Sequence, residues 1–427
     1  MADVVIAGAG PAGATTALVL ARAGVRVTMV DPCRPPALRA ESLPFSGLSL
    51  AAQLGLTDVL RGAWLGSVSH QRLHWRAAQE DQSLVDQKPW LLSRAHLHAG
   101  LRSAALAAGA RLLVDSATIA QDGNLTLRSN TDKRLRPLVV IDARGRAAGG
   151  LAPARPVQVA LPFSAHCRAQ AECLMTLDTL GKAWRWRAQT EDGRVFGALF
   201  CAPQDIRAVK RQALCRTEMS EIVLQKPCDA TLRAAKTVFH APNVLRIGDA
   251  GLARDPIGSH GVTHALRSAL HAAAAARTLL DHPEEAGAAR QFLDNRHRLD
   301  CKSAIESTNA AHAQRGGPAI SATHRPKPPP VDTLLAFRAR RKPVPCLTES
   351  HIRWVGGLLL PASGAPVAYL GGLPAGLVAD LLDRPGTAAE MARRLSRYVP
   401  RKKVSNLLDY LLAEEALVPA EAAANAR

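Results

Sequence analysis

Three spaced glycines near the start of the chain are the first residues whose types and spacing suggest chemistry. Gly8, Gly10 and Gly13 follow the apolar run at residues 4–7, and Asp31 ends the next apolar run. In such a pattern the first glycine permits a tight turn, the second lets a pyrophosphate approach the backbone, and the third allows close helix–strand packing. The terminal acid can accept hydrogen bonds from ribose hydroxyls. The segment therefore predicts a dinucleotide site, whose expected binding residues are Gly8, Gly10, Pro11, Ala12, Gly13 and Asp31.

A second glycine-rich segment, GDAGLARDPIGSHGV at residues 248–262, follows a short apolar run and precedes an alanine-rich helical pattern. A helix start offers free N–H groups and the positive end of the helix dipole to a ligand. The expected cofactor-binding residues of this segment are Gly248, Asp249, Pro256, Gly258, Gly261 and Val262. His260 lies at the same helix start. It is either a proton donor in catalysis or a loop histidine that faces solvent.

The two segments together resemble the FAD-binding motifs of flavoprotein monooxygenases, and of the related flavin-dependent tryptophan halogenases and geranylgeranyl reductases. The resemblance implies that Asp249 hydrogen-bonds the ribityl chain of FAD. It also implies that the loop at residues 256–261 lies against the flavin pyrimidine, with the N-terminus of the next helix directed at the N1–C2=O edge.

Three shorter matches lie between these motifs. The segment from Arg39 resembles the R-x-G-E-x-x-P box of the superfamily, with alanine where its glycine is usual. The segment from Arg94 resembles the R-x-x-F-D helix start, with His98 in place of the acid. Asp142 ends a strand and turn that also match. The resemblance implies that Arg39, Arg94 and Asp142 contact the cofactor, although the two arginines can also be read as ordinary surface residues.

Residues 155–240 interrupt the cofactor-binding halves and are expected to form a substrate domain. Trp184 and Trp186 begin a predicted β-hairpin that turns at Asp192-Gly193. The halogenases carry W-x-W-x-I-P in this region, and here the Ile-Pro is absent. The two tryptophans are candidate substrate-binding residues, but packing in the core is the alternative for both.

The expected activity is hydroxylation of an electron-rich aromatic ring through a flavin C4a-hydroperoxide, as the resemblance implies. Flavin halogenases need an early lysine, and this chain has none before Lys88. No second nicotinamide motif is present, so NAD(P)H is expected to bind transiently as the reductant. An indole needs no ionisation, which favours tryptophan as the substrate. The appended C-terminal domain, the basic charge and the halogenase-like body together favour a tryptophan within a peptide or protein. The layout is similar to that of the flavoprotein monooxygenases of tryptophylquinone biogenesis in quinohemoprotein amine dehydrogenase.

The C-terminal third differs in composition. Residues 314–345 are rich in Pro and Arg and predict a linker or arm. The helical patterns within residues 346–427 resemble a compact winged helix-turn-helix with a basic face. Such a domain presents peptides or partner proteins, binds DNA, or only braces the catalytic domain. The net charge of +18 fits either a solvated surface or an acidic partner. We expect an acidic peptide or protein partner, with a partner-modifying role and no nucleic acid.

The fold class follows from these segments. We expect an α/β protein with a Rossmann-like FAD-binding domain (residues 1–154 and 241–313), an inserted mixed β-sheet substrate domain (155–240) and a small C-terminal winged-helix-like α domain. The eight cysteines are scattered without metal-ligand spacing, and no apolar run is long enough to span a membrane. These features predict a cytoplasmic protein without metal. The alternatives are a geranylgeranyl-reductase-like oxidoreductase and a flavin-binding DNA-binding regulator.

Overall fold

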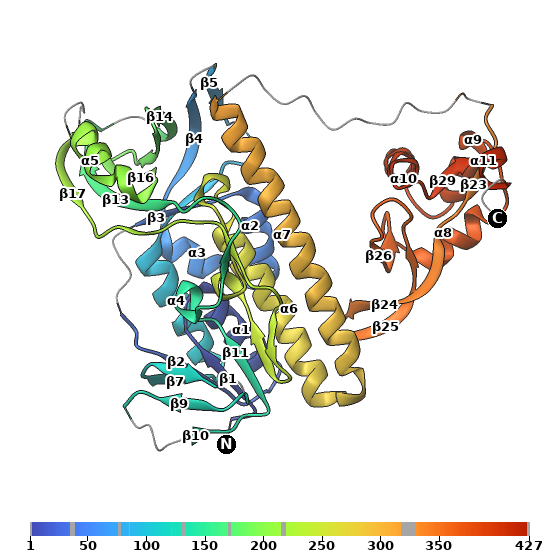
Figure 1. Cartoon of the computed structure of the whole chain (residues 1–427), viewed down its shortest axis with the longest axis horizontal. Helices are drawn as coiled ribbons and strands as arrows, with labels where there is room; N and C mark the ends of the chain where they lie inside the picture. The colour runs from blue at the N-terminus through green and yellow to red at the C-terminus, as the bar shows by residue number, and fades with distance from the viewer. Residues whose placement is uncertain are drawn as a thin grey trace. The chain divides into compact units, whose positions relative to one another are not determined.

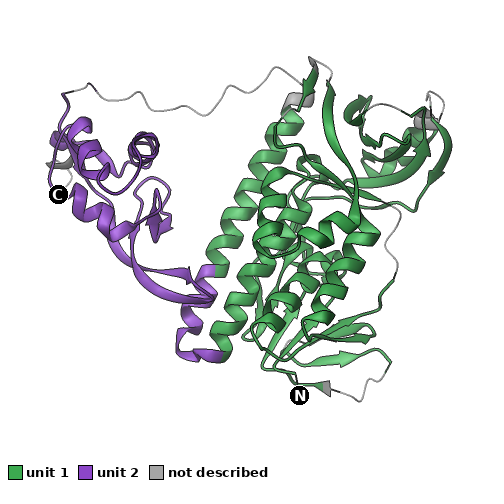
Figure 2. Ribbon diagram, turned by 180° about the vertical axis from the view of Figure 1, so that it is seen from behind, with its two compact units in different colours: residues 1–280, 293–320 green, residues 281–292, 321–427 purple. Residues whose placement is uncertain are grey.

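The computed structural model of the chain divides into two compact units (Figures 1 and 2). Unit 1 comprises residues 1–280 and 293–320, and unit 2 comprises residues 281–292 and 321–427. The structure describes residues 2–34, 39–75, 78–84, 86–120, 122–129, 134–169, 172–214, 219–316, 330 and 332–424. Among these, no helix is long and apolar enough to cross a membrane.

A six-stranded sheet forms the centre of the cofactor-binding half of unit 1. Its strand order is β20-β21-β11-β1-β2-β7, and every neighbouring pair is parallel except β20 with β21. The strands are β1 (Val4–Ala7), β2 (Val27–Asp31), β7 (Arg111–Val114), β11 (Val139–Asp142), β20 (Phe239–Ala241) and β21 (Val244–Arg246). Each residue of β1 and β11 is buried, as expected for parallel strands covered on both faces. This is the Rossmann-like domain that the sequence predicts.

Helices cover this sheet, and two long ones lie together in the ribbon (Figure 1). The helices of unit 1 are α1 (Pro11–Arg22), α2 (Phe45–Gln53), α3 (Thr57–Ala63), α4 (Arg94–Ala107), α5 (Ile206–Leu214), α6 (Gly261–Asp281) and α7 (Ala286–Gly316), with α6 and α7 each reaching into unit 2. The 3-10 turns are η1 (Gly145–Ala148), η2 (Pro203–Asp205), η3 (Gly248–Ala250), η4 (Pro256–Gly258) and η5 (Pro283–Glu285). Alanines and Leu266 bury one side of α6, which accounts for its alanine-rich sequence.

A ten-stranded mixed sheet contains the expected hairpin. Its main order is β17-β13-β16-β15-β14-β4-β6-β3, with β18 paired to β13 and β5 to β4. The strands are β3 (Ala40–Leu43), β4 (Trp64–Trp75), β5 (Ala78–Ser83), β6 (Trp90–Ser93), β13 (Val159–His166), β14 (Cys173–Leu180), β15 (Ala183–Gln189), β16 (Arg194–Cys201), β17 (Ser220–Leu224) and β18 (Cys228–Asp229). Four of them precede residue 154, so this sheet joins the expected substrate domain to the N-terminal segment.

Two small sheets complete unit 1. They consist of β8 (Ala117–Ile119), β9 (Leu125–Leu127) and β10 (Arg134–Leu135), and of β12 (Ala152–Pro153), β19 (Arg233–Ala234) and β22 (Leu252–Ala253). The second one matters for the site, because β22 continues from η3 and pairs with β19. It thereby joins the second glycine-rich segment to the end of the mixed-sheet region.

Unit 2 contains the four helices α8 to α11 and several short strands around their own core. Its elements are β23 (Leu335–Phe337), β24 (Arg340–Thr348), β25 (His351–Leu359), β26 (Pro366–Val367), β27 (Tyr369–Leu370), β28 (Leu373–Pro374), α8 (Ala375–Leu382), α9 (Ala388–Leu395), α10 (Arg401–Ala413), β29 (Leu417–Pro419) and α11 (Ala420–Ala424). Leu382, Met391 and Leu411 are fully buried in this core. A capping box between Thr387 and Glu390 starts α9. The arrangement is the winged-helix-like domain that the sequence predicts.

Two strands of unit 2, β23 and β24, begin inside the segment expected to be a linker. β24 starts at Arg340, and it contains Pro343 and Pro345, which disfavour a strand assignment from sequence. β24 lies at the edge of a three-stranded sheet of order β24-β25-β26, where its one neighbouring strand is β25. A proline is tolerated there because no further strand needs its missing N–H.

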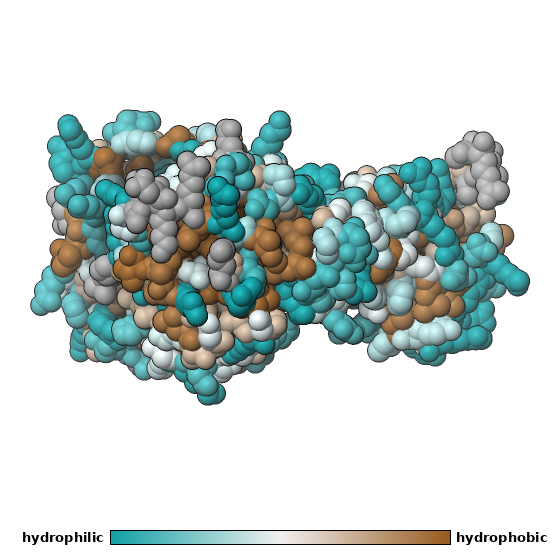
Figure 3. Space-filling view, turned by 90° about the horizontal axis from the view of Figure 1, so that it is seen from below, coloured by the Kyte–Doolittle hydropathy of each residue, from teal (hydrophilic) through white to brown (hydrophobic). Residues whose placement is uncertain are grey.

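Hydrophilic residues cover much of the part of unit 2 seen in Figure 3.

Candidate functional site

The first glycine motif forms a tight turn between β1 and α1. Gly8 has φ +103°, and a β-carbon there would lie 2.4 Å from the carbonyl oxygen of Ala143. A β-carbon on Gly13 would lie 2.0 Å from the carbonyl oxygen of Gly8. Gly10 differs, because a β-carbon there would meet no atom within 4 Å. Gly8 and Gly13 thus serve backbone packing, whereas Gly10 borders open space at the start of α1.

Asp31 lies beside this turn at the end of β2. Its carboxylate accepts hydrogen bonds of 2.7 Å from the backbone N–H groups of Ala9 and Cys33. These bonds fix the acid against the glycine turn, and the residue lines the adjoining cavity. The position suits the ribose contact expected from the sequence, which remains a prediction.

The second motif packs directly on the first. Gly248 has φ +53°, and a β-carbon there would lie 2.8 Å from the β-carbon of Ala12. Its N–H donates to the hydroxyl of Ser268 on α6 at 3.0 Å. Asp249 follows at the cavity wall, with Oδ2 3.8 Å from Nε of Arg146. Burial raises the pKa of Asp249, while the charge of Arg146 opposes that shift.

The loop before α6 is held by its own hydrogen bonds. The Asp255 carboxylate accepts from the N–H of Ile257 at 2.9 Å and lies 3.3 Å from Nε2 of His312. Ser259 adopts a left-handed conformation with φ +51°, which turns the chain into α6. A β-carbon on Gly261 would meet no atom within 4 Å, so this first residue of α6 borders open space.

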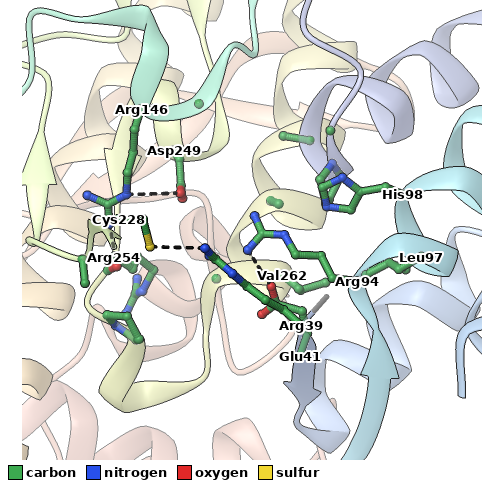
Figure 4. A pocket seen from close by; sticks show the side chains of 18 of the residues that line it. Arg39, Glu41, Arg94, Leu97, His98, Arg146, Cys228, Asp249, Arg254 and Val262 are labelled. Carbon is green, nitrogen blue, oxygen red and sulfur yellow. Dashed lines mark hydrogen bonds and ion pairs between the residues drawn. The ribbon is translucent and has the colours of Figure 1, made fainter. Parts of the chain in front are cut away.

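The two motifs enclose a cavity of about 690 Å³ (Figure 4). Twelve of the predicted site residues line it, namely Gly8, Gly10, Pro11, Ala12, Asp31, Arg39, Arg94, Trp186, Asp249, Pro256, Gly261 and Val262. Six do not, namely Gly13, Asp142, Trp184, Gly248, Gly258 and His260. The volume lies within the range typical of sites for small molecules and cofactors.

Asp142 and His260 lie outside the cavity lining for different reasons. The Asp142 carboxylate is buried and binds the Arg144 guanidinium through bonds of 2.8 and 2.9 Å, which raises the pKa of Arg144. Its role is therefore to hold Arg144, which does line the cavity. His260 is exposed on the loop. Partial burial of its ring and the charges of Arg254 and Arg267 lower its pKa.

Trp184 and Trp186 have different surroundings although they lie two residues apart on β15 and therefore share one face of the strand. Trp184 is 1% exposed, stacks on Phe200 with ring centroids 3.8 Å apart, and donates from Nε1 to Gln158. It is a core residue. Trp186 lines the cavity, together with Phe200 and Ala198 of the neighbouring β16. The mixed sheet thus supplies apolar residues to the lining of the same cavity as the glycine motifs.

Basic side chains dominate the polar lining. Seven arginines and five carboxylates line the cavity among the described residues. Arg94 at the start of α4 binds Glu41 at 3.0 Å, and Arg39 donates to the Cys228 thiol at 3.4 Å. Figure 4 shows Arg39 and Arg94 extending into the cavity, with Arg146 and Asp249 together elsewhere in the view. The excess of positive charge is suited to a pyrophosphate.

The sequence indicates His98 only as the residue that replaces an acid. It lines the cavity, and burial, together with the charges of Arg94 and Arg102, lowers its pKa to about 3. The imidazole is therefore neutral near pH 7. A carboxylate at this position would give Arg94 a second acidic partner besides Glu41, whereas the neutral ring adds no negative charge.

Arg146 and Cys228 are cavity residues that the sequence did not reveal. Arg146 donates to the carbonyl oxygen of Thr231 at 2.7 Å and lies 3.4 Å from Asp229. It therefore joins the β18–β19 connection to the second motif. The only signal for Arg146 in the sequence is its position directly after Gly145, in the turn that follows β11. The partners of both residues are far away along the chain.

Comparisons with known proteins agree with this geometry. Residues 1–104 match a family model described as the FAD binding domain. No curated protein sequence matches the chain. The solved structure of the peptidyl tryptophan dihydroxylase QhpG, described as essential for tryptophylquinone cofactor biogenesis, is similar with a TM-score of 0.71 and 23% identity. The match covers 98% of this chain and 100% of that one.

Two further structures have the same fold. The flavin-dependent halogenase CmlS matches with a TM-score of 0.77 at 16% identity, over 98% of this chain and 96% of that one. PqsL from Pseudomonas aeruginosa, described as a probable FAD-dependent monooxygenase, matches with a TM-score of 0.58 at 15% identity, over 74% and 97% of the two chains. The likeness to QhpG and CmlS extends across both units of the chain.

Proposed function

Because the chain has the fold of FAD-dependent aromatic hydroxylases and flavin-dependent halogenases, with an FAD-binding domain at residues 1–104, we propose that it is a flavoprotein monooxygenase. Its proposed reaction is hydroxylation of an electron-rich aromatic ring, with a tryptophan side chain in a peptide or protein as the favoured substrate. NAD(P)H is the proposed reductant and O₂ the oxidant.

The residues around the cavity fit FAD. The open space at Gly10 and the free N–H groups at the start of α1 suit the pyrophosphate. Arg39 Nε is buried without a hydrogen-bond partner among the described residues, which leaves a donor for the same group. Asp31 would bind the ribose and Asp249 the ribityl chain. The backbone of Gly261 and Val262 would hold the pyrimidine edge.

One observation carries the proposal. Residues of both glycine motifs line the same cavity as Trp186, Ala198 and Phe200, which form an apolar part of its wall and come from the mixed sheet. When bound, FAD would supply the electron transfer from NAD(P)H to O₂. The task of this chain is to orient an aromatic ring against that cofactor and to exclude water. The apolar wall suits an aromatic ring, since it offers mostly carbon atoms as contacts.

Halogenation has less support. Flavin halogenases, which this chain resembles, use a lysine near the substrate, and none of the described residues that line the cavity is a lysine. The arginines there do not replace it, because a guanidinium does not give up its proton at physiological pH. Hydroxylation needs no such lysine.

A peptide or protein substrate is supported by the layout of the chain. The fold likeness to a peptidyl tryptophan dihydroxylase covers the whole of that protein, including the segment that forms unit 2 here. An indole is also electron-rich without ionisation, and no pair of groups suited to ionising a phenol was evident in the sequence. Tryptophan in a polypeptide is therefore the substrate that we propose.

The test combines oxygen consumption with mass spectrometry. The FAD-loaded protein is incubated with NADH or NADPH in air, with N-acetyltryptophanamide or with a short tryptophan-containing peptide. We expect substrate-stimulated oxygen uptake and a product heavier by one or two oxygen atoms. A product without added oxygen but with a saturated double bond in a lipid substrate would instead support a reductase. No turnover with any aromatic substrate would reject the proposal.

A further inference from the structure

The connection between α9 and α10 in unit 2 carries a basic surface that the proposed reaction does not use. From Met391 to Leu408 the chain has six basic residues and no acidic one. Two of the six serve the fold or pair locally. Arg394 donates to the carbonyl oxygens of Arg384 and Pro385, and Arg393 lies 4.0 Å from Glu390.

The other four basic residues form what we call the α9–α10 basic surface, consisting of Arg397, Arg401, Lys402 and Lys403. All four are exposed, and none has an ion pair with another described residue. Tyr398, with 53% of its surface exposed, lies between them in the chain. Exposed aromatic and arginine side chains together are characteristic of surfaces that bind other proteins.

The position of these charges on α10 is unfavourable for the isolated domain. α10 begins at Arg401 after Pro400, has no side-chain cap and has no acidic residue in its first turn. The N-terminus of a helix already carries partial positive charge from its free N–H groups, so three cations there repel that end. A bound anionic group would remove this repulsion and would accept hydrogen bonds from both the side chains and the helix end.

The rest of α10 argues against a nucleic acid as the occupant. Beyond its first turn the exposed side chains include Asp409 and Tyr410, and Glu414 and Glu415 follow the helix. A duplex lying along the helix would bring its phosphates against these carboxylates. A short acidic peptide segment needs only the basic end, and the exposed ring of Tyr410 lies further along the same helix.

We propose that the α9–α10 basic surface binds an acidic segment of a protein partner. The proposal rests on the proposed function in one respect only, namely that the partner is the protein whose tryptophan is oxidised. Binding at this surface would hold the partner to the enzyme independently of the cavity. Opposite charges across such a surface mainly raise the association rate and make binding sensitive to salt.

The test uses the FAD-loaded full chain and a fluorescein-labelled peptide of alternating glutamate and glycine, followed by fluorescence anisotropy. The double variant Lys402→Glu/Lys403→Glu is compared with Arg340→Glu/Lys342→Glu, a matched control that changes the charge equally at two exposed positions of β24. We expect the first variant to weaken peptide binding by about tenfold or more at about 0.1 M salt, and the control to change it by less than about twofold. Flavin absorbance and thermal melting confirm that both variants are folded.

Three results would overturn the proposal. Equal weakening by both variants would indicate binding to net charge alone, and unchanged binding in the first variant would exclude this surface. Tighter binding of a DNA duplex than of the peptide, lost in the first variant, would assign the surface to nucleic acid. Because the assay involves no turnover, peptide binding without substrate oxygenation would reject the proposed function and leave this proposal intact.

Discussion

Nε of Arg146 lies 3.8 Å from Oδ2 of Asp249, and this pair connects the turn after β11 to the second glycine motif. Arg146 also contacts Asp229 and the carbonyl oxygen of Thr231. Its guanidinium therefore links three segments that are far apart in the chain. Burial and Arg146 act in opposite directions on the pKa of Asp249, and burial is the larger effect. The carboxylate is held at the cavity wall, where 42% of its side-chain surface is exposed.

Asp249→Asn should separate cofactor binding from stability. We expect weaker FAD binding, by about tenfold or more, because an amide is a poorer acceptor for a ribityl hydroxyl than a carboxylate. The raised pKa means that the protonated form of Asp249 favours the folded state. This contribution is complete at pH values below the ordinary carboxyl pKa, and it is lost as the pH rises through the raised pKa of the folded protein. The FAD-free variant should therefore melt at a higher temperature than the wild type at pH 8, with a smaller difference at pH 5.

The measurement is thermal melting of both proteins with and without FAD, together with FAD titration by flavin fluorescence. Asp229→Asn is a useful comparison, because Asp229 also contacts Arg146 but hydrogen bonds keep its pKa lowered. It should destabilise the FAD-free protein at neutral pH. Unchanged FAD affinity in Asp249→Asn would mean that Asp249 does not contact the cofactor.

Gly10→Val and Gly13→Ala should fail in different ways. A side chain at Gly10 enters open space and Gly10 has φ −71°, so the fold should survive while FAD binding is lost. A methyl group at Gly13 would overlap the carbonyl oxygen of Gly8, and we expect a loss of about 1–3 kcal/mol in the free energy of unfolding. Urea denaturation and FAD titration of both variants distinguish these effects. Full FAD affinity in Gly10→Val would contradict the assignment of the first motif.

The glycine motifs were readable from sequence because each depends on neighbours within a few residues. The local requirement for Gly8 and Gly13 is visible in the chain, and residues of both motifs line one cavity. Arg146 and Cys228 were missed because their partners lie in remote segments, such as the 189-residue separation between Arg39 and Cys228. No local pattern encodes such contacts.

The two tryptophans show a different limit of sequence reasoning. Strand alternation places Trp184 and Trp186 on one face, so the sequence offers the same two alternatives, substrate binding or core packing, for both. Position along the strand decides between them, since Trp184 meets Phe200 and Gln158 while Trp186 reaches the cavity. The strand β24 was not foreseen for a related reason. Its prolines are acceptable only because it lies at a sheet edge, which the local sequence does not reveal.

Trp186→Ala and Trp184→Ala should therefore have opposite profiles. Removal of the fully buried Trp184 leaves a cavity beside Phe200 and should cost about 3–5 kcal/mol of unfolding free energy. Removal of Trp186 should cost less and instead raise the KM for an aromatic substrate. Denaturation and steady-state kinetics of NAD(P)H oxidation measure the two effects. An unaltered KM in Trp186→Ala would remove this residue from the proposed substrate wall.

Acid should destabilise the protein through buried histidines. Burial and the charges of Arg254 and Arg267 lower the pKa of His264 to about 3. In the unfolded chain a histidine takes up its proton near pH 6.5, so stability is lost as pH falls from that value toward the folded pKa. His264 should contribute to this loss below pH 6.5, with the carboxylate of Asp300, 3.8 Å from its Nδ1, acting in the opposite direction. His264→Gln should flatten the decrease of the unfolding free energy between pH 6.5 and 5, as measured by urea denaturation, whereas the same change at the exposed His240 should not.

His260→Ala tests whether the loop before α6 acts through a side chain or through its backbone. His260 is exposed and outside the cavity lining, and its lowered pKa makes it a poor source of protons near pH 7. We therefore expect normal FAD affinity and an unchanged yield of hydroxylated product per NAD(P)H consumed. His98→Ala is the matched comparison, because His98 lines the cavity beside Arg94 and should alter FAD affinity. If His260→Ala instead binds FAD normally but diverts NAD(P)H oxidation into hydrogen peroxide, the side chain delivers a proton during turnover and is a catalytic residue.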